Sequence, residues 1–486
     1  MTPPTQPVVH EVNTAVWLTD LSREFGRPVT LGDVPGSAWD AVARPGIDAV
    51  WLMGVWERSA AGLALVDAGT RHSFREALPD LRVDDVIGSP YCVRRYEVDD
   101  RFGGRSGLVK ARSALARRGV LLVLDYVPNH VAPDHPWITE RAELFVRGDD
   151  HDVVDSPEAW LALDGRVVAR GRDPYFPPWP DVAQLDAYAP ALRDATARTL
   201  SGIAEQCDAI RCDMAMLPTN DVFHRTWAGR TGPPPPVDFW PDVLAGFRTR
   251  HPDTLMIAEA YWDMEWALHQ QGFDLCYDKR LYDRVVDLDP AGIRDHLRAD
   301  LAFQSRLLRF LENHDEPRVA SRVPREAVPA AAVVLATLPG ATLWHEGQFE
   351  GRWTRPPVFL NRAPDEPADP DLAAWHHRLL ALAPEVRTGA WRLLEVGGWP
   401  DNRTCENVLA WSWTAPDARH LVVVNLSPVP SQGRVAVPWT DLAGSSLGFR
   451  DPLRDETFYR DGDELSARGL YVALPPWGYH LLVATD

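Results

Sequence analysis

The sequence is poor in lysine, and it has no long apolar runs. Lys110 and Lys279 are the only lysines, so arginine supplies nearly all of the positive charge, and the formal net charge is −19. A chain this acidic has no electrostatic attraction for nucleic acid or for an anionic membrane. No run of 18 apolar residues occurs, so we expect no helical membrane span. The N-terminus has neither a basic nor an apolar segment, so we expect no signal peptide.

Cysteine is scarce and irregularly placed. The cysteines are odd in number, and no two of them form a C-x-x-C pair. Such a set argues against a disulfide framework and against a structural zinc site. A reducing cytoplasm is therefore the expected location. The cysteines are Cys92, Cys207, Cys212, Cys276 and Cys405.

The chain is long and has an ordinary apolar content. Its 486 residues, 45% of them hydrophobic, exceed one small domain and suit one large α/β barrel with an accessory domain. The 20 tryptophans are unusually many. They suit stacking on flat, uncharged ligands such as sugar rings, and they equally suit a tryptophan-rich core.

Short apolar runs that alternate with helical patterns predict a parallel sheet. Each run is continuous, as expected of a strand that is buried on both faces. Helices are predicted near residues 37–43 and 108–118. About eight such strand–helix units indicate a TIM barrel. The predicted strands are Thr14–Leu18, Asp48–Met53, Gly119–Leu124, Cys207–Cys212, Thr254–Ala258, Leu307–Leu311 and Ala341–Trp344.

Two segments depart from this alternation. Residues 131–189 contain prolines and aromatics with little periodicity, which predicts a small subdomain inserted after the third strand. From about residue 389 the pattern changes to alternating strands, which predicts an antiparallel β-sandwich packed behind the barrel. The predicted domains are a barrel of residues 1–130 and 190–388, an inserted subdomain of residues 131–189 and a C-terminal β domain of residues 389–486.

Carboxylates stand where four of the predicted strands end. Asp125, Asp213 and Glu259 end the third, fourth and fifth strands, and Asp315 follows the seventh. In a barrel these strand ends share one face, which is where active sites are built. Any one acid has an ordinary alternative as a helix cap or a surface ion pair. Four acids together predict one pocket, because buried charges are costly unless they are paired or used.

Two of these acids suit the cleavage of a glycosidic bond. A retaining glycosidase places its nucleophile and its acid/base about 5–5.5 Å apart. Asp213 is short and suits the nucleophile, and Arg211, two residues before it, points to the same side of a strand and keeps it ionised. Glu259 is longer and suits the proton donor, which needs a raised pKa. Tyr261 and Trp262 are candidates for the apolar surroundings that raise it.

Further residues suit the binding of the sugar. Asp315 is a candidate to bond the ring hydroxyls and to stabilise an oxocarbenium-like transition state. His130 and His314 are candidates to add hydrogen bonds to sugar hydroxyls, although a single histidine is more often structural.

Four motifs together resemble the signature motifs of glycoside hydrolase family thirteen, the α-amylase family. In chain order they are Asp125–His130, Ile210–Asp213, Ile257–Glu259 and Glu312–Asp315, which read DYVPNH, IRCD, IAE and ENHD. Any one of them alone is a weak signal, but the four in order at this spacing are highly specific. The resemblance covers nearly the whole chain and implies a TIM barrel, an insertion after the third strand and a C-terminal β-sandwich.

The resemblance also implies a role for each matching residue. Asp213 matches the nucleophile, Glu259 the acid/base and Asp315 the transition-state stabiliser. The family's residues around the sugar of the cleaved subsite are matched by Arg211, His130, His314 and Asp125, and its stacking tyrosine by Tyr91 in GSPY. Gln184–Asp186, QLD, resembles the short motif of the family's inserted domain.

This chain departs from the family pattern in two places. Many amylases carry Lys-His three and four residues after the nucleophile to bind the sugar on the leaving-group side, and Met216 and Leu217 stand there. We therefore expect poor cleavage inside long chains and better activity on short oligosaccharides or chain ends. Members that bind calcium usually have an Asp at the position of Gln184, and the neutral amide of Asn129 is a poorer ligand than a carboxylate. We expect no cofactor, with calcium near Asn129 as the alternative.

Several functions are compatible with these residues. The first is a retaining α-glycoside hydrolase acting on α-glucans or short α-glucosides through a covalent glycosyl-enzyme intermediate. The second is a transglycosylase that transfers to an acceptor sugar or, less favoured, to phosphate. Arg352, Arg355 and Arg362 are candidate phosphate contacts, or ordinary ion-pair partners of Glu350 and Asp365. The third is a sugar-binding member without activity, which the presence of all three acids disfavours. The expected partner is an oligosaccharide or α-glucan, and the sequence indicates no oligomeric state.

Overall fold

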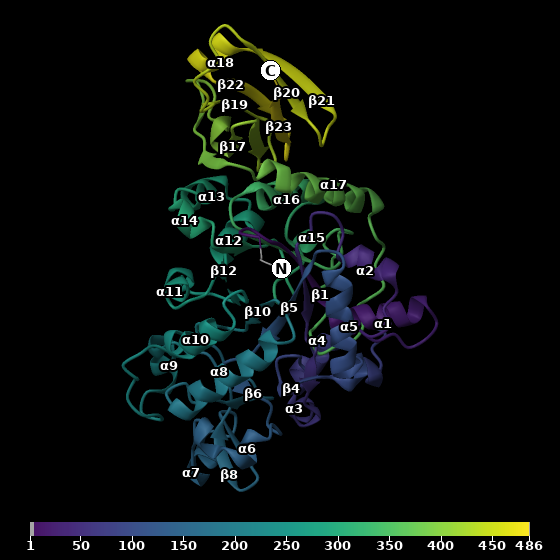
Figure 1. Cartoon of the computed structure of the whole chain (residues 1–486), viewed down its shortest axis with the longest axis vertical. Helices are drawn as coiled ribbons and strands as arrows, with labels where there is room; N and C mark the ends of the chain where they lie inside the picture. The colour runs from purple at the N-terminus through teal and green to yellow at the C-terminus, as the bar shows by residue number, and fades with distance from the viewer. Residues whose placement is uncertain (1–3, 486) are drawn as a thin grey trace.

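The computed structural model describes residues 4–485, and its centre is a closed barrel of eight parallel strands (Figure 1). Around the barrel the strands follow the order β1-β14-β13-β12-β11-β10-β5-β2, so each lies beside its neighbour along the chain. This confirms the predicted TIM barrel. The strands are β1 (Val8–Asn13), β2 (Ala49–Met53), β5 (Leu121–Tyr126), β10 (Ala209–Cys212), β11 (Leu255–Ala258), β12 (Leu275–Tyr277), β13 (Leu307–Arg309) and β14 (Ala341–His345).

Helices surround the barrel and fill the connections between its strands. None of the helices within residues 4–485 is long and apolar enough to cross a membrane. The helices of the barrel are α1 (Thr14–Glu24), α2 (Gly36–Val42), α3 (Ala60–Leu65), α4 (Ala68–Ala77), α5 (Gly104–Ala116), α8 (Pro190–Ala204), α9 (Asn220–Trp227), α10 (Phe239–Arg250), α11 (Glu265–Gln270), α12 (Lys279–Val286), α13 (Pro290–His296), α14 (Leu301–Gln304), α15 (Val319–Arg322), α16 (Val328–Thr337) and α17 (Pro370–Val386).

The first predicted strand is wrong. Thr14–Leu18 begins helix α1, and the strand is the segment just before it, β1. The Asn13 side chain caps the helix by accepting a hydrogen bond from the Val16 amide, and the buried residues of α1 recur at helical spacing. A short apolar run reads alike as a strand or as a buried helix, which is why the boundary was misplaced. The three-residue strand β12 was not identified, whereas the other predicted barrel strands are confirmed to within a few residues.

Residues 131–189 form small pieces of structure at one end of the molecule (Figure 1). Strand β6 (His130–Val131) pairs antiparallel with β9 (Ala183–Gln184), and β7 (Trp160–Leu163) forms a hairpin with β8 (Arg166–Ala169). Two short helices, α6 (Trp137–Glu140) and α7 (Asp150–Asp155), complete the segment. The β6–β9 pairing sets His130 opposite Gln184, which ties the segment to the end of the barrel.

The C-terminal part is an antiparallel sandwich of two sheets at the opposite end of the molecule (Figure 1). The larger sheet has the order β15-β17-β18-β23-β20-β21, the smaller β16-β19-β22, and helix α18 (Gly462–Arg468) joins their edges. This confirms the predicted β-sandwich. Its strands are β15 (Ala390–Leu393), β16 (Val396–Gly397), β17 (Val408–Ala415), β18 (Ala418–Asn425), β19 (Ser431–Val435), β20 (Ser446–Asp451), β21 (Glu456–Asp461), β22 (Leu470–Leu474) and β23 (Tyr479–Thr485).

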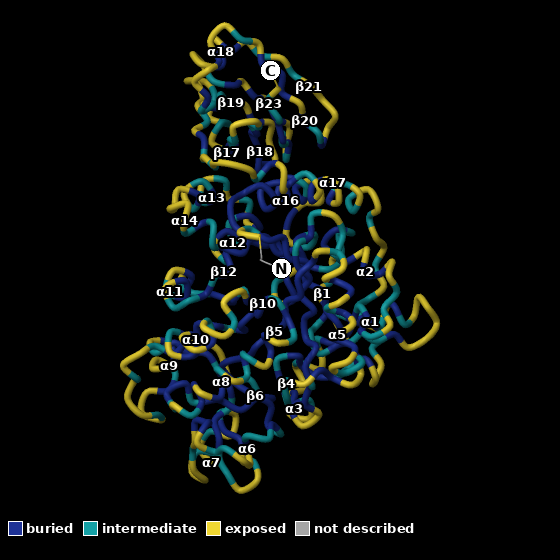
Figure 2. The backbone as a smooth tube through the Cα atoms, viewed as in Figure 1, coloured by how far each residue is buried: buried dark blue, intermediate teal, exposed yellow. Residues whose placement is uncertain are grey.

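Helix α16 lies between the barrel and the sandwich. All of its residues except Pro329 are buried, because the barrel covers one side and strand β18 with helix α17 covers the other (Figure 2). A helix covered on all sides is apolar all round. The Trp413 indole of β17 donates a hydrogen bond of 2.7 Å to the Thr337 carbonyl at the end of α16. The two domains therefore share a continuous apolar contact.

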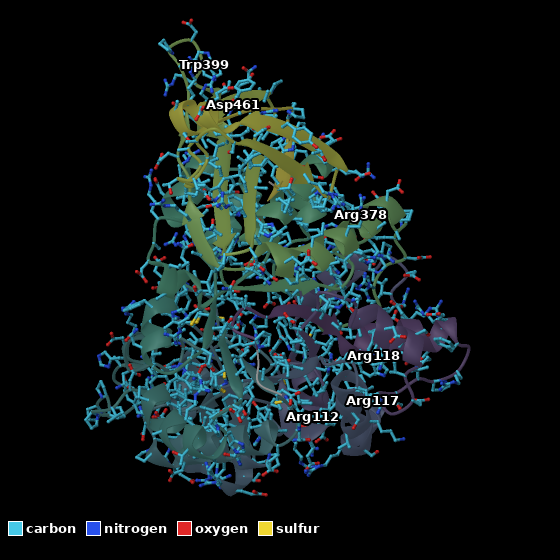
Figure 3. All side chains as sticks on the ribbon, turned by 45° about the horizontal axis from the view of Figure 1, so that its top comes forward. Arg112, Arg117, Arg118, Arg378, Trp399 and Asp461 are labelled. Carbon is cyan, nitrogen blue, oxygen red and sulfur yellow. The ribbon has the colours of Figure 1, made fainter. Side chains whose placement is uncertain are left out.

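Most of the tryptophans serve the core, and a few are exposed. Trp51, Trp56, Trp240, Trp344 and Trp411 are among the largest fully buried side chains. Figure 3 shows Trp399 at the end of the C-terminal domain that faces away from the barrel. The same view shows Arg112, Arg117, Arg118 and Arg378 on the outer surface, where arginine supplies most of the positive charge.

The turn from α17 into β15 depends on one glycine. Gly389 has a φ of +85°, and a Cβ there would lie 2.2 Å from the Thr414 carbonyl oxygen. We predict that Gly389→Ala lowers the melting temperature markedly more than Gly229→Ala. Gly229 has a similar φ of +81° but no atom within 4 Å of its Cβ position.

The expected free energies follow from that difference. The left-handed backbone alone costs about 1–2 kcal/mol at both positions, and the clash at Gly389 adds about 1–3 kcal/mol. Equal losses of melting temperature in the two variants would show that the Thr414 backbone yields to the extra methyl group.

Candidate active site

The predicted acids meet at the carboxyl ends of the barrel strands. Asp125 lies in β5, Asp213 and Glu259 follow β10 and β11 directly, and Asp315 lies in the loop after β13. A cavity of about 320 Å³ opens there. It is lined by Ser89, Tyr91, His130, Trp179, Asp181, Val182, Asp213, Met214, Glu259, Tyr261, Asp315 and Phe359. The structure thus brings Tyr91, His130, Asp213, Glu259 and Asp315 into one pocket.

Arg211 lies beneath this pocket and holds its acids. The guanidinium is 1% exposed, with Nη1 2.8 Å from Asp213 Oδ1 and Nη2 2.7 Å from Glu259 Oε2. Asp125 Oδ1 lies 3.5 Å from the same Nη1. Strand register explains the arrangement, because β10 pairs with β5 so that Arg211 stands opposite Asp125. One buried cation therefore contacts three carboxyl groups from neighbouring strands.

Glu259 is poised to be protonated near neutral pH. Burial raises the pKa of Glu259 to about 8, although the Arg211 charge opposes the rise. Its Oε2 accepts a hydrogen bond of 2.6 Å from the Met214 amide, and its Oε1 accepts one of 3.2 Å from the Tyr261 hydroxyl. A carboxylic acid that keeps its proton at pH 7 suits a proton donor. The predicted influence of Tyr261 thus includes a direct hydrogen bond.

Asp315 is held as a carboxylate by its neighbour. Burial by itself would raise the pKa of Asp315, but the charge and the hydrogen bond of His314 bring it well below the usual range. His314 Nε2 lies 3.0 Å from Asp315 Oδ2. The Asn313 side chain fixes the loop by accepting hydrogen bonds from the amides of Asp315 and Glu316. Asp315 therefore presents a negative charge to the pocket.

Asp125 and His130 are the remaining polar residues at this end of the barrel that the sequence analysis predicted. Asp125 Oδ2 accepts hydrogen bonds from the Trp51 indole at 3.0 Å and the Gly54 amide at 3.2 Å, and burial raises the pKa of Asp125 to about 6. Burial lowers the pKa of His130 to about 4, so this imidazole is neutral and both donates and accepts hydrogen bonds. Arg211, Asp125 and His314 stand behind the pocket lining and support it.

Two residues of the site were missed by the sequence analysis. Met214 follows Asp213, takes a φ of +41° and lines the pocket beside Glu259. Glu11 lies in β1 and bonds His314 Nδ1 at 2.5 Å. The signal for the other acids was a carboxylate where a predicted strand ends, whereas Glu11 lies inside β1, in VVHEVN. The predicted first strand, Thr14–Leu18, also begins after Glu11, so that signal does not mark it.

Met216 and Leu217 do not face the pocket. Both are buried, with exposed fractions of 0% and 2%, and neither belongs to the pocket lining. The left-handed turn at Met214 directs the chain inward after the nucleophile, so the apolar side chain beside Glu259 is that of Met214. The interpretation of Met216 and Leu217 as the leaving-group wall is therefore wrong, and Met214 lines the pocket instead.

Asn129 and Gln184 form hydrogen bonds with each other. The Gln184 amide nitrogen donates to Asn129 Oδ1 at 2.9 Å and to the Asn129 carbonyl at 3.0 Å, and the Asn129 amide nitrogen donates to Gln184 Oε1 at 3.2 Å. Gln184 is fully buried. A calcium ion needs oxygen ligands, but an N–H donor is directed at the two oxygens that Asn129 offers. The residues present therefore do not fit calcium.

The three arginines after the last barrel strand have protein partners. Arg362 pairs with Asp80 and Asp85 at 2.8 and 2.7 Å. Arg355 donates to the Asp315 carbonyl at 2.6 Å, and Arg352 donates to the Glu366 carbonyl. These partners differ from the expected Glu350 and Asp365. Arg362 forms ion pairs, whereas Arg352 and Arg355 donate to backbone carbonyls. None of the three lines the pocket.

The curated relatives of this chain are glucan-processing enzymes. It is 27% identical over 354 residues to the α-amylase MalA of Haloarcula japonica, which covers 69% of this chain and 47% of the relative. It is 25% identical over 283 residues to the α-1,4-glucan:maltose-1-phosphate maltosyltransferase of Burkholderia pseudomallei, which covers 55% of this chain and 21% of the relative. The matches thus span less than half of the length of either relative. No family model matches the sequence.

Solved structures share the fold over the whole chain. The maltogenic α-amylase AmyB of Thermotoga neapolitana superposes with a TM-score of 0.70 at 19% identity, covering 99% of both chains. The α-amylase of Geobacillus thermoleovorans in complex with acarbose gives 0.69 at 17% identity, covering 100% of both chains. In its sequence motifs, its barrel and these relatives, the chain is similar to glycoside hydrolase family thirteen, the α-amylase family, with no subfamily specified.

Proposed function

We propose that this protein is a retaining α-glycoside hydrolase that acts on α-glucans or short α-glucosides. The observation that carries the proposal is the pair of carboxyl groups on the Arg211 guanidinium. Asp213 is held against the cation, and Glu259 is held beside it with a pKa near 8. Retaining cleavage needs this combination, a nucleophilic carboxylate next to a carboxylic acid.

The proposed reaction has two steps. Asp213 attacks the anomeric carbon while Glu259 gives its proton to the departing oxygen, so the glycosidic bond breaks as the bond to Asp213 forms. Glu259 then takes a proton from water, which attacks the same carbon and releases Asp213. Asp315 faces the ring during both steps, and His314 holds it from behind. The negative charge of Asp315 is placed to stabilise the positive charge that develops on the sugar.

Transglycosylation is the second candidate, and the pocket lining favours it over a sugar-binding member without activity. The lining beside Glu259 includes Met214, Tyr261 and Phe359, which offer an apolar surface. Such a surface disfavours water as the attacking group, so the covalent intermediate persists longer and an acceptor can intercept it. Transfer to phosphate has no support, because Arg352, Arg355 and Arg362 have partners in the protein and none of them lines the pocket.

The two catalytic assignments are tested by amide substitutions. Asp213→Asn should lower kcat on maltoheptaose on the order of 10⁴-fold or more, because it removes the nucleophile with little change of shape. Glu259→Gln should do likewise on maltoheptaose but keep a fast first step with an activated aryl α-glucoside, which needs little protonation. Wild-type kcat/KM should fall as pH rises through about 8, because Glu259 loses its proton there.

A second buried acid provides the control for Glu259. Glu265 in α11 has a pKa raised by burial to about 7 but does not line the pocket. Glu265→Gln should therefore retain the wild-type rates and the wild-type alkaline limb. Near-wild-type turnover of maltoheptaose by Asp213→Asn or Glu259→Gln would refute the assignment of that residue.

We predict that Met214 weakens the binding of a leaving group that is itself a sugar. Its side chain offers no hydrogen bond beside the proton donor, so a second sugar must desolvate its hydroxyls there. Met214→Ala should raise the ratio of kcat/KM on maltoheptaose to that on an aryl α-glucoside by roughly tenfold. Met216→Ala is the control, because it leaves a cavity in the core and should cost about 2–5 kcal/mol of stability. An unchanged ratio in Met214→Ala, or an equal rise in Met216→Ala, would contradict this prediction.

We also propose that the protein needs no calcium near Asn129. Millimolar calcium and a chelator should leave the wild-type melting temperature equal, because the amide pair of Asn129 and Gln184 satisfies the site. Gln184→Asp presents a carboxylate in place of the donor, so this variant should melt earlier in chelator and recover with calcium. A chelator that destabilises the wild-type protein would disprove calcium independence.

A further inference from the structure

Glu11 is a carboxylate with no contact to solvent. It is 0% exposed in strand β1, opposite Trp51 of β2 and His345 of β14 in the strand register. One oxygen bonds His314 Nδ1 at 2.5 Å, and within the described residues the other, Oε2, has no hydrogen-bond partner. A buried charge is retained only with a partner of opposite sign. His314 supplies that partner.

The second nitrogen of His314 faces the pocket. Nε2 lies 2.7 Å from the Tyr91 hydroxyl oxygen and 3.0 Å from Asp315 Oδ2. Both Tyr91 and Asp315 line the cavity. A histidine that donates at both nitrogens carries both protons and a positive charge. Glu11, His314 and Asp315 thus form a line from the barrel interior to the pocket.

We propose that Glu11 is a positioning residue that acts through His314, fixing its ring and its positive charge against Asp315 and Tyr91. The proposal rests on the proposed function, in which Asp315 acts on the sugar and His314 holds Asp315. Its basis is the buried contact on the side of His314 that faces away from the pocket. A neutral group in place of Glu11 would leave His314 free to lose its proton and to turn away from Asp315.

The charges around the pair agree with this assignment. Burial by itself would lower the pKa of His314, but the charges of Asp315 and Glu11 raise it well above the usual value. The Tyr91 ring stacks on the imidazole and the Trp51 ring meets it edge-on, so the ring is held from both sides. The titratable groups around the pair are Asp315 on the loop of His314, Tyr91 before β4 (Val93–Val98), Asp125 on β5, Arg211 on β10, Tyr277 on β12, His345 on β14 and Glu346 directly after β14.

Glu11→Gln is the principal test because it keeps the shape and removes the charge. The loss of a carboxylate in contact should lower the pKa of His314 by about 1–3 units. Glu259 sets the wild-type alkaline limb of kcat/KM on maltoheptaose at about pH 8. Once the pKa of His314 falls below that of Glu259, His314 sets the limb instead, and the limb should move to lower pH. Glu11→Asp retains the charge and should keep the wild-type limb. If Glu11→Gln does not fold, a shifted limb in Glu11→Asp would overturn the proposal and an unshifted one would support it.

Glu312→Gln is the matched control. Glu312 is also fully buried, but it bonds Arg318 at 2.6 Å and the Val319 amide at 2.8 Å instead of His314. This variant should lose stability without moving the alkaline limb. An equal shift in Glu312→Gln would show that any buried acid near the barrel end has this effect, and would overturn the proposal.

A double variant separates an effect through His314 from a direct effect on Glu259. His314→Gln and the combined Glu11→Gln/His314→Gln should show the same alkaline limb, because the charge of Glu11 then has no histidine to act on. A further shift in the double variant would assign the effect to Glu259 and would contradict the proposal.

Titration of His314 by NMR gives a measurement that needs no activity. Histidine-labelled wild-type protein and Glu11→Gln would be compared, with His314→Gln identifying the signal. We expect the His314 signal to titrate at lower pH in Glu11→Gln, and an unchanged titration would refute the link. Absence of turnover on all α-glucosides by the wild-type protein would instead refute the proposed function and leave this titration interpretable.

Discussion

The buried guanidinium of Arg211 is the interaction on which the site depends. It is 1% exposed and contacts carboxyl groups that come from three adjacent strands. Three buried acids so close together would repel one another and would be costly to desolvate without this cation. The barrel supplies the geometry through the register of β5, β10 and β11. Arg211 stands opposite Asp125 and Ile257, and Asp213 and Glu259 each follow two residues later, toward the carboxyl ends of the strands.

Charge balance at this end of the barrel explains the division of roles among the acids. Two buried cations contact a larger number of carboxyl groups, so these carboxyl groups cannot all be ionised at low cost. Glu259, with a pKa of about 8, keeps its proton and so adds no negative charge at neutral pH. Asp315 stays ionised beside His314. The acids are Glu11, Asp125, Asp213, Glu259 and Asp315, and the cations are Arg211 and His314. Burial thus makes Glu259 the proton donor despite its contact with Arg211, and the contact with His314 makes Asp315 the stabiliser.

Local sequence patterns predict much of the fold and of the site. Short apolar runs identify six of the eight barrel strands, and the acids directly after those runs identify the pocket, because parallel strand ends meet on one face. The pattern fails at β12, which has only three residues, and at β1, where the chain changes from strand to helix without a break in apolar character. Glu11 was missed because it lies inside β1 and not directly after a run, and because the predicted first strand begins after it.

Other features depend on contacts that no local pattern contains. Sequence spacing points to Met216 and Leu217 as the leaving-group wall, but the left-handed backbone at Met214 buries both and turns Met214 to the pocket. The reciprocal bonds of Asn129 and Gln184 arise from the pairing of β6 with β9, which joins residues 55 positions apart. The Glu11–His314 bond spans 303 positions. Residue types and their order therefore indicate the chemistry, and the closure of the barrel decides which side chains meet, because it joins strands from opposite ends of the chain.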